Sequence, residues 1–158
     1  MSHNNSSLRS INGFLIIIVL IQLTSCAGSA RFSEDQLIIE MEKTPCYGFC
    51  PVYTIKIDQA GHGIFKGAEN TDQVGLFSFR LKKKEITDLH FAFEQTGFFE
   101  LKDRYHERVS DLPTTFLSYR IDGREKKIMD YYGAPPELKN LEKQIEALVL
   151  SKKMQKTE

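Results

Sequence analysis

The 158-residue sequence has no excess of charge of either sign, because 21 lysines and arginines balance 21 aspartates and glutamates. A chain without a basic excess has no electrostatic reason to bind nucleic acid, so we expect no nucleic-acid partner. It also lacks a glycine-rich phosphate loop, a nucleophile elbow and a paired-carboxylate motif. The sequence therefore shows none of these common signatures of nucleotide-binding and hydrolytic enzymes, and it predicts no cofactor.

Long apolar runs are also scarce. The one near the N-terminus covers residues 11–23, and its uninterrupted core, residues 14–21, is shorter than a membrane span, which needs about 20 consecutive apolar residues. A polar start with one basic residue, Arg9, precedes it. This order is typical of a secretory signal peptide, which we place at residues 1–25. The alternative is an uncleaved N-terminal anchor.

The residues at the predicted cleavage point, Leu23-Thr24-Ser25-Cys26, resemble the lipobox of bacterial lipoproteins. The resemblance implies that Cys26 takes up the lipid and becomes the first residue of the mature protein. Two or three acyl chains hold a protein firmly on a membrane, because each buried methylene contributes about 0.8 kcal/mol. Ala27 and Gly28 do not resemble the aspartate that retains such proteins at the inner membrane. We therefore expect a lipid-anchored protein of the bacterial cell envelope, at the outer membrane.

The remaining chain has the length of one domain and contains no internal repeat. Residues 26–35 are mostly small and polar, which predicts a lipidated tether. Residues 36–150 are enough for a single core without several disulfides. Residues 151–158 are rich in lysine and predict a basic tail.

Side-chain alternation predicts six strands in this domain, because apolar residues recur at every second position. Tyr53, Ile55 and Ile57, for example, alternate with polar residues. Asp122-Gly123 supplies the residue types that a tight hairpin turn between the last two strands requires. The six strands are expected near residues 37–42, 53–58, 64–67, 76–81, 117–121 and 124–131.

Two segments show helical periodicity instead. From Lys83 onward the apolar residues recur at helical spacing, and Gly97 stands where a C-terminal cap is expected. A second helix is predicted to begin at Pro135-Pro136, since proline is well tolerated in the first turn. The expected buried stripes are Ile86, Leu89 and Phe93 in the first helix and Leu138, Leu141, Ile145 and Leu148 in the second.

These elements predict an α+β two-layer sandwich with the order ββββαββα. We expect a mainly antiparallel sheet with both helices on one face and water on the other, as antiparallel sheets allow. Polar residues at outward strand positions indicate the wet face: Glu40, Glu42, Lys56, Asp58, Arg80 and Arg120.

The most distinctive segment, Thr44-Pro45-Cys46-Tyr47-Gly48-Phe49-Cys50-Pro51-Val52-Tyr53, lies between the first two strands. It resembles the C-x-G-x-C-P-x-Y signature of an uncharacterised family of bacterial domains of unknown function, often found behind lipoprotein signals. The similarity extends through Gly97-Phe98-Phe99, Asp111-Leu112-Pro113 and Asp130-Tyr131-Tyr132-Gly133-Ala134-Pro135-Pro136. The resemblance implies domain limits and an important cysteine loop, and it implies no reaction.

Four interpretations of the cysteine pair remain open. Thiols outside the cytoplasm are oxidised, and with Cys26 lipidated only Cys46 and Cys50 remain, which favours a structural disulfide between them. Redox catalysis is less favoured, because active cysteines are more typical of C-x-x-C motifs or helix starts. A metal site needs further ligands, and His62, His90 and His106 show no zinc-site spacing to the pair. We therefore predict no metal site, and unpaired thiols are the fourth possibility.

Other candidate residues favour surface roles. Asp103, His106, Glu107 and Asp111 lie in one loop and are more typical of a solvated loop than of a metal or acid/base site. His90, in the first helix, is expected to pack or to face solvent. A possible binding surface consists of Tyr47, Phe49, His106, Asp111, Tyr131 and Tyr132.

Two functional hypotheses follow. The favoured one is a non-enzymatic envelope module that binds a protein or a cell-wall component, or supports the envelope, and contacts the membrane through its lipid anchor. The alternative is a thiol-disulfide redox protein or sensor that uses Cys46 and Cys50.

Overall fold

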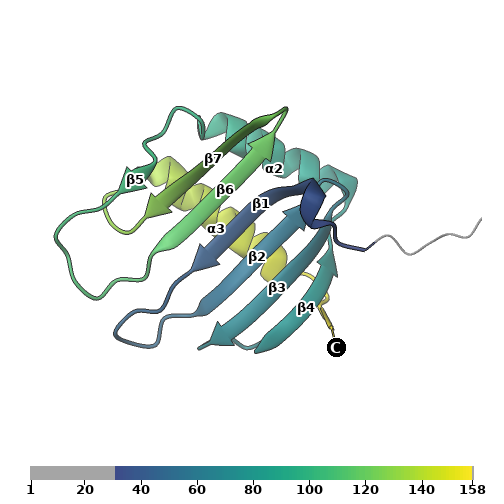
Figure 1. Cartoon of the computed structure of the whole chain (residues 1–158), viewed down its shortest axis with the longest axis horizontal. Coiled ribbons are helices and arrows are strands. Elements are labelled where there is room, and N and C mark those ends of the chain that lie inside the picture. Colours follow the sequence, from purple (N-terminus) through teal and green to yellow (C-terminus); the bar gives the residue numbers. More distant parts are fainter. Residues whose placement is uncertain (1–30, 158) are drawn as a thin grey trace, which may run out of the picture. The chain divides into compact units, whose positions relative to one another are not determined.

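The computed structural model describes residues 31–157 as an α+β fold built on an eight-stranded sheet (Figure 1). Cys26 and the predicted signal peptide lie outside the described residues. The elements, in chain order, are η2 (Glu34–Gln36), β1 (Leu37–Lys43), β2 (Val52–Asp58), β3 (His62–Glu69), β4 (Gly75–Arg80), α2 (Lys83–Gln95), β5 (Arg104–Tyr105), β6 (Thr115–Ile121), β7 (Arg124–Asp130), α3 (Pro136–Leu150) and β8 (Gln155–Lys156).

The strand order across the sheet is β5-β7-β6-β1-β2-β3-β4-β8. Every neighbouring pair is antiparallel except β5 and β7, so the sheet is mostly antiparallel. β1 lies in the middle, where Met41 pairs with Ile55 on β2 and with Leu117 on β6. All three side chains are fully buried, which places the core beneath the central strands.

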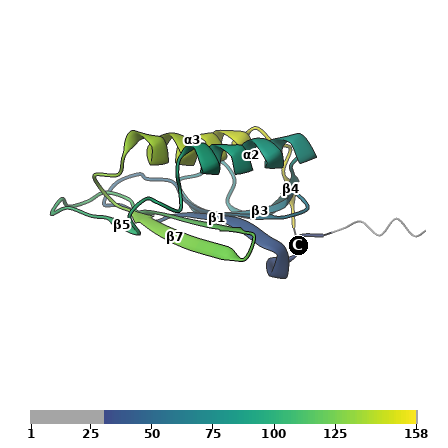
Figure 2. The same ribbon diagram turned by 90° about the horizontal axis from the view of Figure 1, so that it is seen from above.

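Both helices cover the same face of the sheet (Figure 2). α2 buries Ile86, Leu89 and Phe93, as its periodicity predicts. α3 buries Leu138, Leu141 and Ile145, but its last buried residue is Val149 rather than Leu148, which is only partly buried. The predicted α+β class, with two helices on one side of a mainly antiparallel sheet, is confirmed.

The predicted count of six strands is wrong, because the sheet also contains β5 and β8. Each has two residues, which is too short to show the alternation that identifies a strand in a sequence. β5 lies in the segment that we interpreted as a solvated loop, and it pairs in parallel with the end of β7. β8 lies in the lysine-rich tail and pairs with Phe77 and Ser78 of β4.

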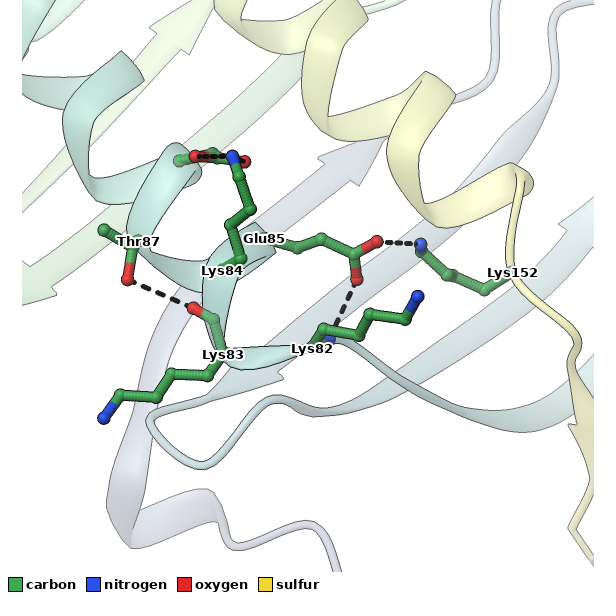
Figure 3. A network of polar contacts seen from close by, with 7 residues as sticks. Lys82, Lys83, Lys84, Glu85, Thr87 and Lys152 are labelled. Carbon is green, nitrogen blue, oxygen red and sulfur yellow. Dashed lines mark hydrogen bonds and ion pairs between the residues drawn. The ribbon is translucent and has the colours of Figure 1, made fainter.

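The start of α2 is tied to the residues that follow α3 (Figure 3). Glu85 accepts a 2.8 Å hydrogen bond from the backbone N–H of Lys82, which caps the helix, and a 2.6 Å bond from Lys152. Lys152 and the Lys82 amide together lower the pKa of the Glu85 carboxyl. The chain therefore remains attached to the domain beyond α3.

Asp58 was expected on the wet face of the sheet, and this prediction is wrong because the residue is fully buried. Its carboxylate accepts hydrogen bonds from the backbone N–H groups of Ala60 and His62, both at 2.9 Å, and of Ser33 at 3.1 Å. The His62 Nδ1 atom lies 2.9 Å from the second oxygen. A buried carboxylate is stable when such donors satisfy it, and Asp58 thus closes the β2–β3 turn.

The predicted β6–β7 hairpin turn is confirmed by its backbone, since Asp122 and Gly123 both have positive φ, at 49° and 74°. Gly97, predicted as a helix cap, has φ 61° and lies two residues after the end of α2. Within residues 31–157, no helix is both long and apolar enough to cross a membrane.

Candidate functional site

The cysteine loop, residues 44–51, joins β1 to β2 at one end of the sheet (Figure 1). A disulfide connects Cys46 to Cys50, whose Cα atoms are 5.7 Å apart. Between them Tyr47 and Phe49 point into solvent, with 92% and 95% of their surfaces exposed. The loop contains no charged residue, although 27% of the whole chain is charged. It therefore presents two large aromatic side chains on a short covalent ring.

Hydrogen bonds fix both ends of this loop. Thr44 donates its backbone N–H to the carbonyl of Thr114 at 3.0 Å, and its hydroxyl accepts the Thr114 N–H at 2.9 Å. Asn70, in the β3–β4 loop, donates its side-chain amide to the carbonyl of Cys50 at 3.2 Å. With its ends held and its middle closed by the disulfide, the loop loses little further entropy when it contacts a partner.

Tyr53, the last residue of the C-x-G-x-C-P-x-Y motif, does not lie on the surface. It is buried on β2, stacks on Phe65 at a ring distance of 5.3 Å, and donates its hydroxyl to Glu146 on α3 at 2.5 Å. Lys43, at the end of β1, binds the other oxygen of Glu146 at 2.8 Å. Burial and the acceptor carboxylate raise the Tyr53 pKa, so the hydroxyl remains a donor. The motif thus ends in a structural contact that holds α3 against the sheet.

A second polar contact lies under the same helix. Asp130, at the end of β7, and Glu142, on α3, are 1% and 5% exposed, and Lys139 forms ion pairs with both. Burial raises the pKa of Glu142 to about 8, and the nearby Asp130 charge contributes. One cation therefore serves two buried carboxylates, and the raised pKa favours the protonated form of Glu142 at neutral pH.

The loop between β5 and β6 lies at the same end of the sheet as the cysteine loop (Figure 1). His106 stacks on Tyr131 with ring centres 5.2 Å apart, and the Tyr131 hydroxyl donates to the carbonyl of Val109 at 2.6 Å. Asp103 instead pairs with Lys126 at 2.9 Å, and Asp111 is exposed with φ 70°. Among the described residues, no group of three or more acidic, histidine or cysteine side chains is arranged to hold a metal ion.

The candidate binding residues thus fall into two groups at one end of the domain. Tyr47 and Phe49 form the exposed tip of the cysteine loop, whereas His106, in the neighbouring β5–β6 loop, stacks on Tyr131, which follows β7. The two loops are joined at their bases by the Thr44–Thr114 hydrogen bonds. Tyr132, next to Tyr131, is 44% exposed.

His90 has a more specific environment than the sequence predicts. Its Nδ1 atom lies 2.7 Å from the Tyr119 hydroxyl, across the gap between α2 and β6. Burial lowers the His90 pKa and raises that of Tyr119 to about 12. The sequence gives no signal for this pair, because its members are 29 residues apart.

Most of the domain matches a known family model. Residues 37–149 match the model of a domain of unknown function, DUF6438. The chain belongs to the DUF6438 family. No curated protein and no solved structure matches this chain. The family defines the domain and brings no activity with it, and Cys26 lies outside the matched residues.

Within this DUF6438 domain, two of the motifs singled out in the sequence are held by the same helix, α3. Tyr53 follows the cysteine loop and Asp130 precedes the Tyr131-Tyr132 segment, and both contact charged residues of α3. These buried contacts hold the ends of two loops, while Tyr47 and Phe49 stay free of the core. The arrangement separates a structural part from an exposed part that is suited to binding.

Proposed function

We propose that this DUF6438 protein is a lipid-anchored, non-enzymatic binding module of the bacterial outer membrane, and that the tip of its cysteine loop contacts an envelope protein. The observation that carries the proposal is the exposure of Tyr47 and Phe49 on a disulfide-closed loop. Aromatic side chains dominate the energetics of many protein interfaces, because each buries a large surface while losing few rotamers.

The position of the loop supports this proposal. β1 runs from Leu37, where the chain enters the sheet, to Lys43, where the cysteine loop begins. At about 3.3 Å per residue, its seven residues separate the two ends of the strand by roughly 20 Å. The described chain therefore enters the sheet at the end of β1 that lies away from the cysteine loop, so residues 44–51 are not where the preceding segment joins the domain.

The binding part of the proposal is tested by site-specific photo-crosslinking in living cells. A photo-reactive amino acid at Tyr47 should capture one defined partner, and the same group at Val74 is the matched control. Val74 is also apolar and 60% exposed, in the adjacent β3–β4 loop. A photo-reactive amino acid at the exposed Pro45 should give the same product, and this product should be lost when Tyr47→Ser and Phe49→Ser are added. Equal products from residues 47 and 74, or no product, would refute the binding role.

The envelope part rests on the lipobox-like residues that end at Cys26. In a cell fractionation experiment, Cys26→Ser should abolish lipid attachment and leave the precursor uncut or mislocalised. A variant that is processed and membrane-bound like the unchanged protein would refute lipid anchoring.

A thiol-disulfide protein is the second candidate, because Cys46 and Cys50 are only half-buried in an exposed loop. A redox enzyme would have a bond that is easily reduced, at a potential well above the roughly −300 mV typical of structural bridges. Redox titration of the purified protein measures this directly. Single cysteine variants that trap mixed disulfides with other proteins would favour the enzyme over the binding module.

A further inference from the structure

A groove of about 630 Å³ lies at the opposite end of the domain from the cysteine loop, next to the β6–β7 turn. Its sides come from α2, with His90 and Phe91, and from Phe99, which follows that helix. Tyr119 and Asp122 belong to the β6–β7 hairpin and complete it. The volume lies within the range of small-molecule binding sites. The groove has no residue in common with the cysteine loop, so the two are independent.

The apolar part of the groove is a rigid cluster of rings. Tyr119 stacks on Phe93 with centres 3.9 Å apart, and Phe99 lies 5.7 Å from Tyr119. Phe91, on the exposed side of α2, has 60% of its surface in contact with solvent. An exposed phenylalanine beside a preformed aromatic wall offers an apolar contact without any rearrangement of the core.

The charges around the groove are mainly negative. Glu94, Glu100 and Asp122 line it, and Arg124 is the single lysine or arginine among its lining residues. The Arg124 guanidinium lies 3.8 Å from the centre of the Phe99 ring and 4.0 Å from Glu100. Within residues 31–157, neither Glu94 nor Asp122 forms an ion pair. Two carboxylates beside the aromatic wall therefore lack a counter-charge.

Two further observations agree with a negative groove. Burial is the main cause of the raised Tyr119 pKa, and the negative charges of Asp122 and Glu94 raise it further. Both carboxylates therefore act on the interior of the groove. Burial lowers the pKa of His90, although the Asp122 charge acts in the opposite direction, and this disfavours a positive charge on the ring. Arg124 shows that a cation on an apolar stem is accommodated here, since it rests on the face of Phe99.

We propose that this groove binds a small organic amine, with its ammonium group between Glu94 and Asp122 and its apolar stem against Phe91. Charge complementarity selects the cation, and the aromatic wall selects an apolar stem over a hydrated inorganic ion. Arg124 competes with the ligand, because its own charge reduces the negative potential of the groove.

The test measures binding to the full chain in a non-ionic detergent by isothermal titration calorimetry. The probes are 2-phenylethylammonium, the neutral 2-phenylethanol and the anionic 3-phenylpropionate, which share one ring and a short stem. The ammonium probe should bind at least about tenfold more tightly than either of the others, which corresponds to about 1.4 kcal/mol. Equal binding of all three, or a preference for the anion, would overturn the proposal.

Three variants locate the binding. Asp122→Asn with Glu94→Gln should weaken ammonium binding about tenfold, and asparagine tolerates the positive φ of residue 122. Arg124→Gln should strengthen it, because a competing cation is removed. Glu137→Gln, an exposed carboxylate on α3, is the matched control and should change nothing. Melting temperatures confirm that each variant folds, and a double variant that folds and binds like the unchanged protein would overturn the assignment.

The same titration distinguishes a small amine from a basic peptide. A tripeptide with a central lysine has the same ammonium group on a similar stem, but its backbone must lie outside the groove. The proposal predicts that the tripeptide binds no more tightly than pentylammonium. Binding of the tripeptide about tenfold more tightly would assign the groove to a peptide segment and overturn the proposal of a small ligand.

Discussion

Glu142 makes the stability of this domain depend on pH in an unusual direction. The residue is 5% exposed on α3, and the nearest acidic neighbour, Asp130 on β7, already forms an ion pair with Lys139. The other charged groups of this region, Lys43 and Glu146, bind each other. Burial, reinforced by the Asp130 charge, raises the Glu142 pKa from 4.5 to about 8. The folded domain therefore holds a proton that the unfolded chain releases.

The sign and size of the effect follow from linkage. A group whose pKa is raised by folding contributes its full stability below its unfolded value, and this contribution is lost as the pH rises toward the folded value. The window for Glu142 is thus about pH 4.5 to 8. The rise from 4.5 to about 8, at 1.36 kcal/mol for each pH unit, means that Glu142 can lower the free energy of unfolding by at most roughly 5 kcal/mol across this window. We expect a measured loss of about 2 to 4 kcal/mol between pH 5 and 8.5 from this residue.

The perturbation that isolates this term is Glu142→Gln, because glutamine has the shape of the protonated acid and does not ionise. Urea unfolding at several pH values from 5 to 8.5 gives the free energy of unfolding of each variant. The difference between Glu142→Gln and the unchanged protein cancels the other titrating groups. It should be near zero at pH 5 and reach about 2 to 4 kcal/mol in favour of the glutamine variant at pH 8.5.

Glu137→Gln is the matched control, since it removes an exposed carboxylate five residues before Glu142 and should change the free energy of unfolding by less than about 0.5 kcal/mol at every pH. A Glu142→Gln variant whose advantage does not change between pH 5 and 8.5 would refute the reasoning. A variant that is less stable than the unchanged protein at pH 8.5 would refute it equally.

Three further predictions concern the backbone and the disulfide. Gly123→Val should destabilise the domain by about 1 kcal/mol or more in urea unfolding, because valine is strained at positive φ. No atom lies within 4 Å of the added Cβ, so steric contact does not contribute, and an unchanged midpoint would show that the positive φ carries no strain. Gly63→Ala places a Cβ 2.1 Å from the Phe79 ring and should cost roughly 1 to 3 kcal/mol, whereas unaltered stability would contradict the close contact of strand and ring. Replacing Cys46 and Cys50 together by alanine should lower stability by about 2 kcal/mol or less, because the closed loop is short; loss of the fold would contradict a local role.

Much of the fold was predictable because the core follows simple periodicity. Tyr53, Ile55 and Ile57 alternate in the sequence and are buried in the structure. Asp58 continues that strand and was misassigned, because its burial depends on amide groups of the following turn and of Ser33. An aspartate three residues before Gly61 is typical of a turn, and that signal was present in the sequence.

The polar contacts under α3 were not predictable from residue type. Glu142 lies four residues after Leu138 and three before Ile145, so its position belongs to the buried stripe while its chemistry favours solvent. The structure buries Glu142, and the conflict between its position and its chemistry is the one feature of the sequence that points to an unusual environment. Tyr53 and Glu146 are 93 residues apart, and a single sequence does not show that they meet.

The two short strands, β5 and β8, cover parts of the two rims of the sheet. An unpaired strand at the rim of a sheet is a template on which another copy of the chain can add its own strand. β8 occupies part of the rim of β4, and the Thr157 N–H donates to the carbonyl of Leu76 at 2.9 Å. At the other rim, β5 covers the end of β7, and the uncovered part begins with four charged residues, Arg124, Glu125, Lys126 and Lys127.

The last few residues of the described chain therefore cover part of a rim that would otherwise be open to another strand. A chain that ended before Gln155 would expose the rim of β4, where Leu76 is already 40% exposed and Phe77 is half-buried. Such a chain would keep its core, since the buried residues of α3 end at Val149. It would nonetheless gain an open rim through which one folded copy could join another.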